Sequence, residues 1–144
     1  MPICRGMAAA LAVGAEGVYV GTAFIPTHEC SAHPNMKQAL IDATDISTLS
    51  YLGPVGMGRM LRNRLGEQVL HAQYQDGYIE KITKLVYSSR AYQAACLQGN
   101  IENGAVFLSA AAGLIKEIKG AAQVIEDMVP NCDEVLARLW REYN

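Results

Sequence analysis

The sequence lacks the features that would assign it at once to a nucleic-acid-binding, membrane or disordered class. Its 12 basic and 14 acidic residues leave a net charge of −2, which argues against a nucleic-acid surface, because such surfaces are strongly basic. No apolar run reaches the ~18 residues that a membrane span requires. Hydrophobic residues make up 51% of the 144 positions, so a folded core is expected instead of disorder. The composition predicts one domain without a nucleic-acid or membrane partner.

The cysteines lack the spacing of a disulfide framework or of a zinc site. The four cysteines are Cys4, Cys30, Cys96 and Cys132. They are widely spaced without a C-x-x-C pair, which predicts reduced, mostly buried thiols of a cytoplasmic protein. His28 and His33 flank Cys30, but the spacing fits no zinc pattern with a second ligand pair elsewhere. We therefore expect no metal site here.

The N-terminal segment resembles a secretion signal only in part. Arg5 precedes the short apolar run from Met7 to Val13, which is at the lower length limit for the core of a signal peptide. We expect a cytoplasmic location, with secretion as the alternative.

The most informative stretch lies near the N-terminus. The Ala-rich run from Met7 to Val13 predicts a helix that ends at Gly14, because glycine best adopts the left-handed cap. Gly17–Val20 is predicted to be a buried strand, since it holds two β-branched residues and a tyrosine. At its exit, Gly21 exposes backbone N–H groups and Thr22 adds a hydroxyl donor. This order of elements predicts the edge of a βα-barrel where a phosphate could sit, with an ordinary strand-to-loop turn as the alternative.

Helices are predicted for most of the remaining chain, from the helical spacing of apolar residues and, at Glu102–Ala112, from a run of small residues. The predicted helices are Pro34–Ala43, Gly58–Gln73, Tyr78–Leu97 with a break near Ser88, Glu102–Ala112, Ala121–Val129 and Asp133–Tyr143. Breaks are expected at Gly53-Pro54, Asp76-Gly77, Gly99-Asn100 and Pro130, and Asn131 is expected to cap the last helix in a capping box with Glu134. Gly17–Val20 is thus the one clear strand, and a lone strand leaves N–H and C=O groups unpaired along both edges. We therefore expect either that its neighbours lie outside this sequence, which makes the chain a predicted fragment, or that the folded region around it is distorted.

The residues from Met7 to Phe24 resemble the last-strand region of the family of nitronate monooxygenases and flavin-dependent enoyl-acyl-carrier-protein reductases. The likeness continues through Glu29–Pro34 and Lys37–Leu40, and it returns at Gly99–Gly104 and Ala112–Lys116. Those enzymes are FMN-binding (β/α)8 barrels, and the resemblance covers only their C-terminal part. It implies an α/β fold class: a C-terminal fragment of a TIM barrel, with the last barrel strand in about residues 1–30 and a helical extension over 31–144.

The resemblance also implies a cofactor site. Gly21 and Thr22 would contact the FMN phosphate, with Tyr19 and Val20 supplying backbone contacts beside it. In the family, a strand ending in Gly-Gly supplies the other phosphate contacts, and this chain has Pro2-Ile3-Cys4 there instead. Half of the phosphate site is therefore expected to be absent.

The chain departs from the family at two further points. Ser109 and Ala110 stand where relatives usually carry Gly-Gln close to the flavin, which removes an amide donor and acceptor; sequence drift and lost activity are both open interpretations. The catalytic histidine of the family lies on an earlier strand. His28, His33 and His71 do not match its position, so no catalytic residue is assigned, and Ala32-His33-Pro34 matches a family phrase that starts a helix.

A basic cluster is the remaining candidate. Arg59, Arg62 and Arg64 lie close together in the sequence. They are interpreted as a solvated helix face, and contact with an anionic substrate arm or nucleotide phosphate is the alternative, because arginine binds such groups in a bidentate way.

These observations predict part of an FMN-dependent oxidoreductase that is inactive alone. By resemblance, the full-length enzyme would bind FMN and a small-molecule substrate, would oxidise nitronates or reduce enoyl thioesters with NAD(P)H, and could form a homo-oligomer. The alternative is a non-catalytic α-helical interaction protein derived from such an enzyme.

Overall fold

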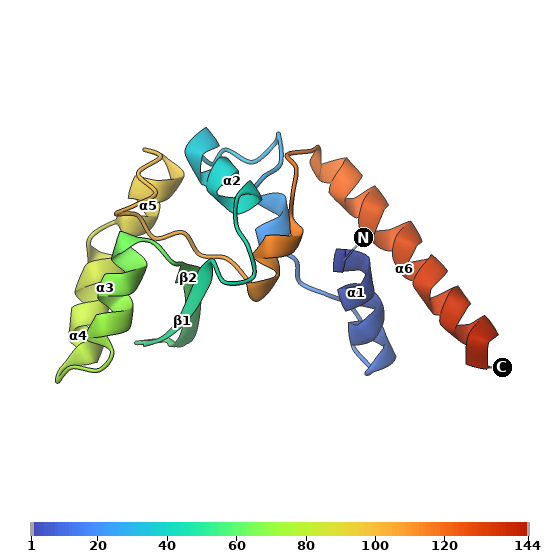
Figure 1. Cartoon of the computed structure of the whole chain (residues 1–144), viewed down its shortest axis with the longest axis horizontal. Coiled ribbons are helices and arrows are strands. Elements are labelled where there is room, and N and C mark those ends of the chain that lie inside the picture. The colour runs from blue at the N-terminus through green and yellow to red at the C-terminus, as the bar shows by residue number, and fades with distance from the viewer. Residues whose placement is uncertain (1, 144) are drawn as a thin grey trace.

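The computed structural model describes residues 2–143, which form mainly helices and a two-stranded sheet (Figure 1). In chain order the elements are α1 (Pro2–Ala12), η1 (Thr22–Phe24), α2 (Pro34–Ile41), β1 (Thr48–Gly53), β2 (Gly56–Leu61), α3 (Arg64–Ala72), α4 (Tyr78–Ile82), η2 (Thr83–Ser88), α5 (Ala91–Cys96), η3 (Ala110–Leu114) and α6 (Ala121–Tyr143). Here η1 and η3 are 3-10 helices and η2 is a π-helix. No helix among the described residues combines the length and apolarity needed to cross a membrane.

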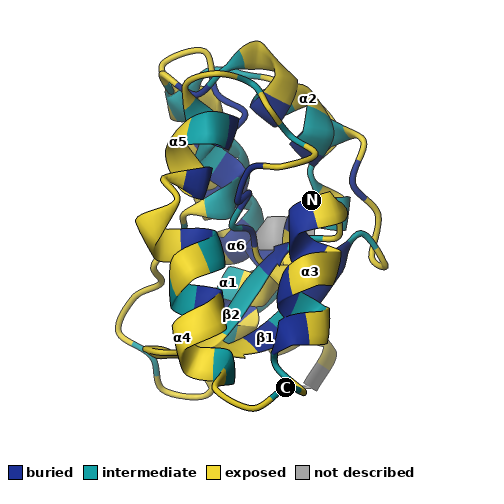
Figure 2. Cartoon of the chain, turned by 90° about the vertical axis from the view of Figure 1, so that its left-hand side faces the viewer, coloured by how far each residue is buried: buried dark blue, intermediate teal, exposed yellow. Residues whose placement is uncertain are grey.

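The elements follow one another across the molecule in three groups. The β1–β2 hairpin packs with α3 and α4 at one end, α2 lies in the middle, and α1 runs beside α6 at the other end (Figure 1). Viewed from the hairpin end, α4 presents mainly exposed residues, while β1 and α3 carry buried ones (Figure 2). Each group has its own core: the hairpin core includes Leu49, Tyr51, Met60, Val69 and Ile82, the middle core Met36, Leu40, Ala95 and Val106, and the α1–α6 core Cys4, Ala8 and Cys132.

The end of α1 confirms the predicted glycine cap. Gly14 has a φ of +98°, and its amide donates to the carbonyl of Leu11 at 3.0 Å. The amide of Ala15 donates to the carbonyl of Ala10 at 3.0 Å. These two bonds form a Schellman motif, which satisfies carbonyls that the last helical turn leaves without a partner. The helix begins earlier than predicted, because Pro2-Ile3-Cys4 forms its first turn.

The predicted strand at Gly17–Val20 is wrong. The segment has no regular secondary structure, and within residues 2–143 its amides make no backbone–backbone hydrogen bond. Val18 is partly exposed and the side chain of Tyr19 is fully exposed, at 101%. A strand requires a neighbouring strand to pair with its N–H and C=O groups. The β-branched residues are thus insufficient to form a strand where no such neighbour lies alongside.

The predicted helix at Gly58–Gln73 is wrong in its first part. A hairpin occupies this region, with β1 antiparallel to β2 and Gly53 opposite Gly56 in the register. Gly56 has a φ of +109°, which suits the end of the tight turn. The ring of Tyr51 covers Gly58 so closely that a Cβ there would lie 2.5 Å from a ring atom. These contacts between strands override the helical spacing of the apolar residues.

Asn63 explains why α3 begins where it does and how the later chain is held. Its side-chain oxygen caps α3 by accepting the amide of Gly66 at 2.8 Å. Its side-chain nitrogen donates to the carbonyl of Gly104 at 2.9 Å and also to the carbonyl of Ile101. Asn63 is 7% exposed, so these polar groups have little access to water. One buried amide therefore joins the hairpin, α3 and the turn at residues 101–104.

The predicted helix at Glu102–Ala112 is also wrong. After the turn at residues 101–104 the chain runs extended beside β2, where the amide of Leu61 donates to the carbonyl of Val106 at 2.8 Å and Phe107 forms an antiparallel bridge with Met60. A helix, η3, starts only at Ala110. The small residues that suggested a helix instead allow this close approach to the sheet.

The C-terminal helix α6 is continuous, so the predicted break at Pro130 is wrong. The predicted capping role of Asn131 is wrong for the same reason, because its side chain donates to the carbonyl of Asp127 at 2.5 Å from within the helix. Proline removes one backbone hydrogen bond and usually kinks a helix. Val124 and Cys132, on either side of it, are buried, and packing of this face keeps the helix in one piece.

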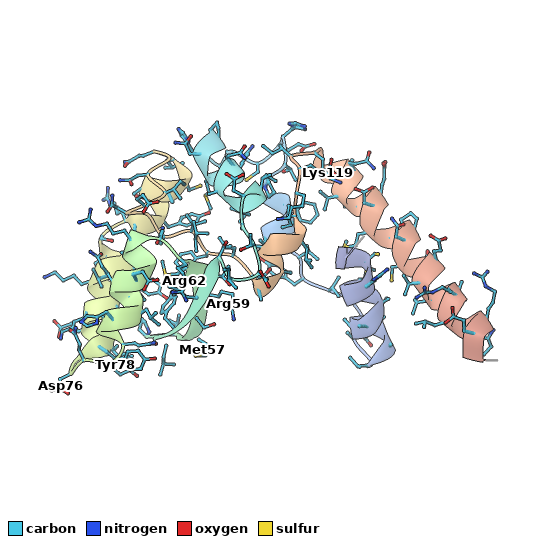
Figure 3. The ribbon with its side chains drawn as sticks, in the orientation of Figure 1. Met57, Arg59, Arg62, Asp76, Tyr78 and Lys119 are labelled. Atoms are coloured by element: carbon cyan, nitrogen blue, oxygen red, sulfur yellow. The ribbon has the colours of Figure 1, made fainter. Side chains whose placement is uncertain are left out.

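Polar contacts fix the start of α6. The carboxylate of Glu29 accepts the amide of Ala121 at 2.9 Å, and this bond lowers the pKa of Glu29. Lys119 is labelled near the start of α6 in Figure 3. Its Nζ lies 2.6 Å from Oε1 of Glu117 and 2.6 Å from Oδ2 of Asp127. Hydrogen bonds to Asp127 and Glu117 raise the pKa of Lys119. These contacts hold the segment before α6 against residues 27–29.

The other helices agree with the sequence-based predictions. Helix α2 starts at Pro34 and ends at Ile41, two residues before the predicted end. The long helix predicted at Tyr78–Leu97 is divided after Ser88, and Arg90 there has a φ of +57°. The breaks predicted at Asp76-Gly77 and Gly99-Asn100 are confirmed as non-helical.

We predict that Asn63→Ala destabilises the fold by about 2–4 kcal/mol, because it removes a helix cap and leaves the carbonyls of Ile101 and Gly104 with less complete hydrogen bonding. Urea unfolding followed by circular dichroism measures the change. Asn103→Ala is the control, since Asn103 is exposed and bonds only to Asn100 nearby. Equal stabilities of the two variants would contradict the role given to Asn63.

A second prediction concerns the close approach in the hairpin. Gly58→Ala should destabilise the fold by about 1–3 kcal/mol, because the new methyl group forces the Tyr51 ring out of its buried position. Gly17→Ala is the control, since a Cβ there meets no atom within 4 Å. The unfolding midpoints of both variants should be compared with that of the parent chain. An unchanged midpoint for Gly58→Ala would contradict the close packing of the Tyr51 ring on Gly58.

Candidate functional site

The four residues predicted to bind FMN lie along one small hollow of about 140 Å³. Its lining consists of Tyr19, Val20, Gly21, Thr22, Ala23, Ser109, Ala111 and Ile115. The loop after α1 supplies one side of the hollow, and the start of η3 supplies the other. The sequence suggested the first side and the departure at Ser109, but not that the two come together.

A hydrogen bond joins the two sides of the hollow. The backbone amide of Ser109 donates to Oγ1 of Thr22 at 3.0 Å, across 87 positions of sequence. The hydroxyl of Ser109 accepts the amide of Ala111 at 3.3 Å and so caps η3. Because each hydroxyl oxygen serves as an acceptor in these bonds, both hydroxyl hydrogens can still be donated to a ligand.

The backbone at Gly21 is open to an approaching group. A Cβ at this position would meet no atom within 4 Å, and the residue is exposed. Val20 is half-buried, whereas Tyr19 extends fully into solvent. A ligand can therefore approach the chain at Gly21 without displacing a side chain.

The hollow contains no charged side chain, since its lining is apolar except for Thr22, Ser109 and the phenol of Tyr19. An anion at this place would be bound by N–H and hydroxyl dipoles alone. Such groups suit a phosphate, because oriented amides form anion-binding concavities. They also leave most of its negative charge without a cationic partner from this chain.

The basic cluster does not form a single helix face, so that interpretation is wrong. Arg59 lies on β2 and donates to Oγ1 of Thr48 at 2.8 Å. Arg62 follows β2 and lies 2.7 Å from Glu67 in an exposed ion pair, while Arg64 is the first residue of α3. Figure 3 shows Arg59 and Arg62 at the hairpin. None of the three lines the hollow.

His33 has the structural role that its sequence context predicted. Its Nδ1 accepts the amide of Asn35 at 3.1 Å, which caps α2 just before Pro34. The imidazole packs against Gly99, where a Cβ would lie 2.3 Å from Nδ1. Within residues 2–143, no group of three or more His, Cys, Asp or Glu residues is arranged to hold a metal ion.

Three lining residues were missed by the sequence analysis, namely Ala23, Ala111 and Ile115. The resemblance at Ala112–Lys116 provided a signal near two of them, because it marked this segment as shared with flavin-binding proteins. Their small or aliphatic side chains carry no chemistry of their own, so composition alone could not distinguish them from core residues.

The fold is similar to part of the solved structures of larger proteins. A solved structure of FabK from Thermotoga maritima is 28% identical to this chain and matches it with a TM-score of 0.85, over 100% of this chain and 45% of that one. Nitroalkane oxidase from Streptomyces ansochromogenes matches with a TM-score of 0.70 at 24% identity, over 96% of this chain and 39% of that one. The second likeness concerns the fold alone.

Curated relatives show the same partial coverage. A Bacillus subtilis protein described as a probable nitronate monooxygenase is 48% identical over 44 residues, which are 31% of this chain and 13% of that protein. Rv1533 of Mycobacterium tuberculosis, described as a monooxygenase, is 28% identical over 141 residues, covering 94% of this chain and 38% of that protein. The chain thus spans less than half the length of each relative. The family model for nitronate monooxygenase matches residues 2–131, and the chain therefore belongs to the nitronate monooxygenase family.

Proposed function

We propose that this chain is the C-terminal part of an FMN-dependent oxidoreductase with a TIM-barrel fold, and that Gly21 and Thr22 contact the flavin phosphate. The observation that carries the proposal is the hollow itself: the residues that the family resemblance assigns to FMN line it together with Ser109, the position where the family usually has Gly-Gln. Membership of the nitronate monooxygenase family supports the reaction class.

The chemistry of these residues fits a phosphate end. The amides near Gly21 and the hydroxyl of Thr22 would donate to phosphate oxygens, and the bond from Ser109 fixes the Thr22 oxygen at 3.0 Å. FMN, when bound, supplies electron transfer from a nitronate, or from NAD(P)H to an enoyl thioester. The chain's own contribution is to hold and orient one end of the cofactor. No His, Asp, Glu, Lys or Cys belongs to the lining of the hollow as the structure describes it, so we infer that proton transfer is the role of the rest of the enzyme.

The size and charge of the hollow support a partial site. Pockets for complete cofactors occupy roughly 300–1,000 Å³, whereas this hollow measures about 140 Å³. It has room for a phosphate but not for an isoalloxazine ring. The exposed segment at Gly17–Val20, which lacks a pairing strand, supports a further wall contributed by other barrel strands.

We expect the chain expressed alone to retain no FMN after desalting. A second phosphate wall would supply about two charge-assisted hydrogen bonds, each worth roughly 1.5–3 kcal/mol, so its loss weakens binding by about two to four powers of ten. Visible absorbance of the desalted protein measures bound flavin. A chain that elutes with near-equimolar flavin would show that it completes its own site, and the partial-site proposal would fail.

In a barrel completed with the remaining strands of Thermotoga maritima FabK, Thr22→Ala should weaken FMN binding about ten- to a hundredfold, the value of one hydrogen bond to a charged group. Flavin fluorescence titration gives the affinity. Thr83→Ala is the matched control, because Thr83 is the first residue of η2, does not line the hollow, and donates its hydroxyl to the carbonyl of Ile79 one turn earlier in α4. If both variants bound FMN with equal affinity, the proposed contact between Thr22 and the phosphate would be contradicted.

A further inference from the structure

Helices α1 and α6 meet through a core built on two cysteines. Cys4, Ala8 and Cys132 form this buried cluster, and each cysteine is 1% exposed. Met7, Leu11, Val135 and Leu136 pack around it. The two cysteines come from near opposite ends of the sequence, but the parallel course of α1 and α6 (Figure 1) brings them into one cluster.

The two thiols are also electrostatic neighbours. The pKa of Cys132 is raised, first by burial, then by Asp133 and by Cys4. The geometric basis for pairing them is that both cysteines belong to the same small buried cluster between α1 and α6. The third buried member of the cluster is Ala8, whose small side chain allows α1 and α6 to pack closely at this point. Both cysteines are therefore held facing one shared interior on rigid helices.

In the part of the chain that the structure describes, Cys4 borders a hollow. A hollow of about 240 Å³ lies between α1 and α6, lined by Cys4, Arg5, Asn131, Glu134, Val135, Arg138 and Arg141. Three of these side chains are guanidinium groups, against one carboxylate. An anionic small molecule is attracted to such a lining. Cys132 does not line the hollow, so a reagent inside it meets Cys4 first.

We propose that Cys4 and Cys132 form a reversible disulfide, made by exchange with an anionic low-molecular-weight disulfide that enters this hollow. The Cys4 thiolate attacks one sulfur of the small disulfide, which forms a mixed disulfide and releases one small thiolate. The Cys132 thiolate then attacks the sulfur of Cys4 and releases the second. The two cysteines lose two electrons and two protons, and the small disulfide gains both to become two thiols.

The consequence is a covalent link between the first and last helices. Helix α1 leads directly into the loop that ends at Thr22, and α6 starts at the segment held by Glu29. The link closes nearly the whole chain into one loop, which restricts the unfolded state strongly. This proposal concerns oxidation of the α1–α6 core and does not depend on FMN binding.

A second thiol pair provides an internal control. Cys30 and Cys96 are half-buried in the middle core, and both act on the phenol of Tyr92, whose pKa is raised first by a hydrogen bond with Cys96. No hollow lined by arginines borders them among the described pockets. Variants that keep one pair and remove the other separate the two sites.

The experiment treats the folded Cys30→Ser, Cys96→Ser double variant with oxidised glutathione. We expect the intact mass to fall by two hydrogen atoms, thiols titratable in denaturant to fall from two per chain to none, and Tm to rise by roughly 5–15 °C. Adding Cys132→Ser should instead leave glutathione attached at Cys4. The complementary variant, Cys4→Ser with Cys132→Ser, should gain neither the internal bond nor the Tm increase.

A test on the parent chain covers the case in which a variant fails to fold. After oxidation and alkylation, peptide mapping should recover Cys4 linked to Cys132. Arg138→Gln with Arg141→Gln should slow the reaction with oxidised glutathione about three- to tenfold but leave the reaction with neutral hydroxyethyl disulfide unchanged. Unreacted thiols, covalent dimers, or a lasting glutathione adduct while Cys132 is present would each overturn the proposal.

Discussion

The arrangement of the candidate site depends on one buried amide, that of Asn63. By capping α3 and donating to two carbonyls of the turn at residues 101–104, it fixes where the later chain leaves the hairpin. From there the chain runs beside β2, through the bond between Leu61 and Val106, and reaches Ser109 at the hollow. The contact between Ser109 and Thr22 is therefore the last step in a series of polar contacts that begins at the hairpin.

Local signals in the sequence predicted the structure where the chain determines its own conformation. The Schellman end of α1 at Gly14 and the start of α2 at Pro34 rest on contacts within a few residues. The hairpin and the extended segment at residues 105–108 rest on long-range contacts, such as Tyr51 over Gly58. Because small and apolar residues serve equally in helices and in close-packed extended segments, their spacing could not distinguish the two.

The candidate site was predictable in part for the same reason. Tyr19–Thr22 was proposed as an FMN contact from one continuous sequence segment, and the four residues line one hollow in the structure. The strand predicted there was wrong, because a strand requires a pairing partner, and the sequence of one segment does not show whether such a partner is present. The approach of Ser109 to Thr22 was not predictable either, since the two residues lie 87 positions apart and meet only through the path of the chain between them.

The exposed segment at Gly17–Val20 has a further consequence for how this polypeptide behaves in solution. It combines Val18, Tyr19 and Val20, residues typical of strands, with amides that form no backbone–backbone hydrogen bond within residues 2–143. Natural proteins protect such edges with charge, proline or a covering element, because uncovered ones add strands from other molecules. Proline is absent here and Glu16 is the nearest charge. The same residues that suit a barrel wall are thus the place where copies of the isolated chain would begin to aggregate.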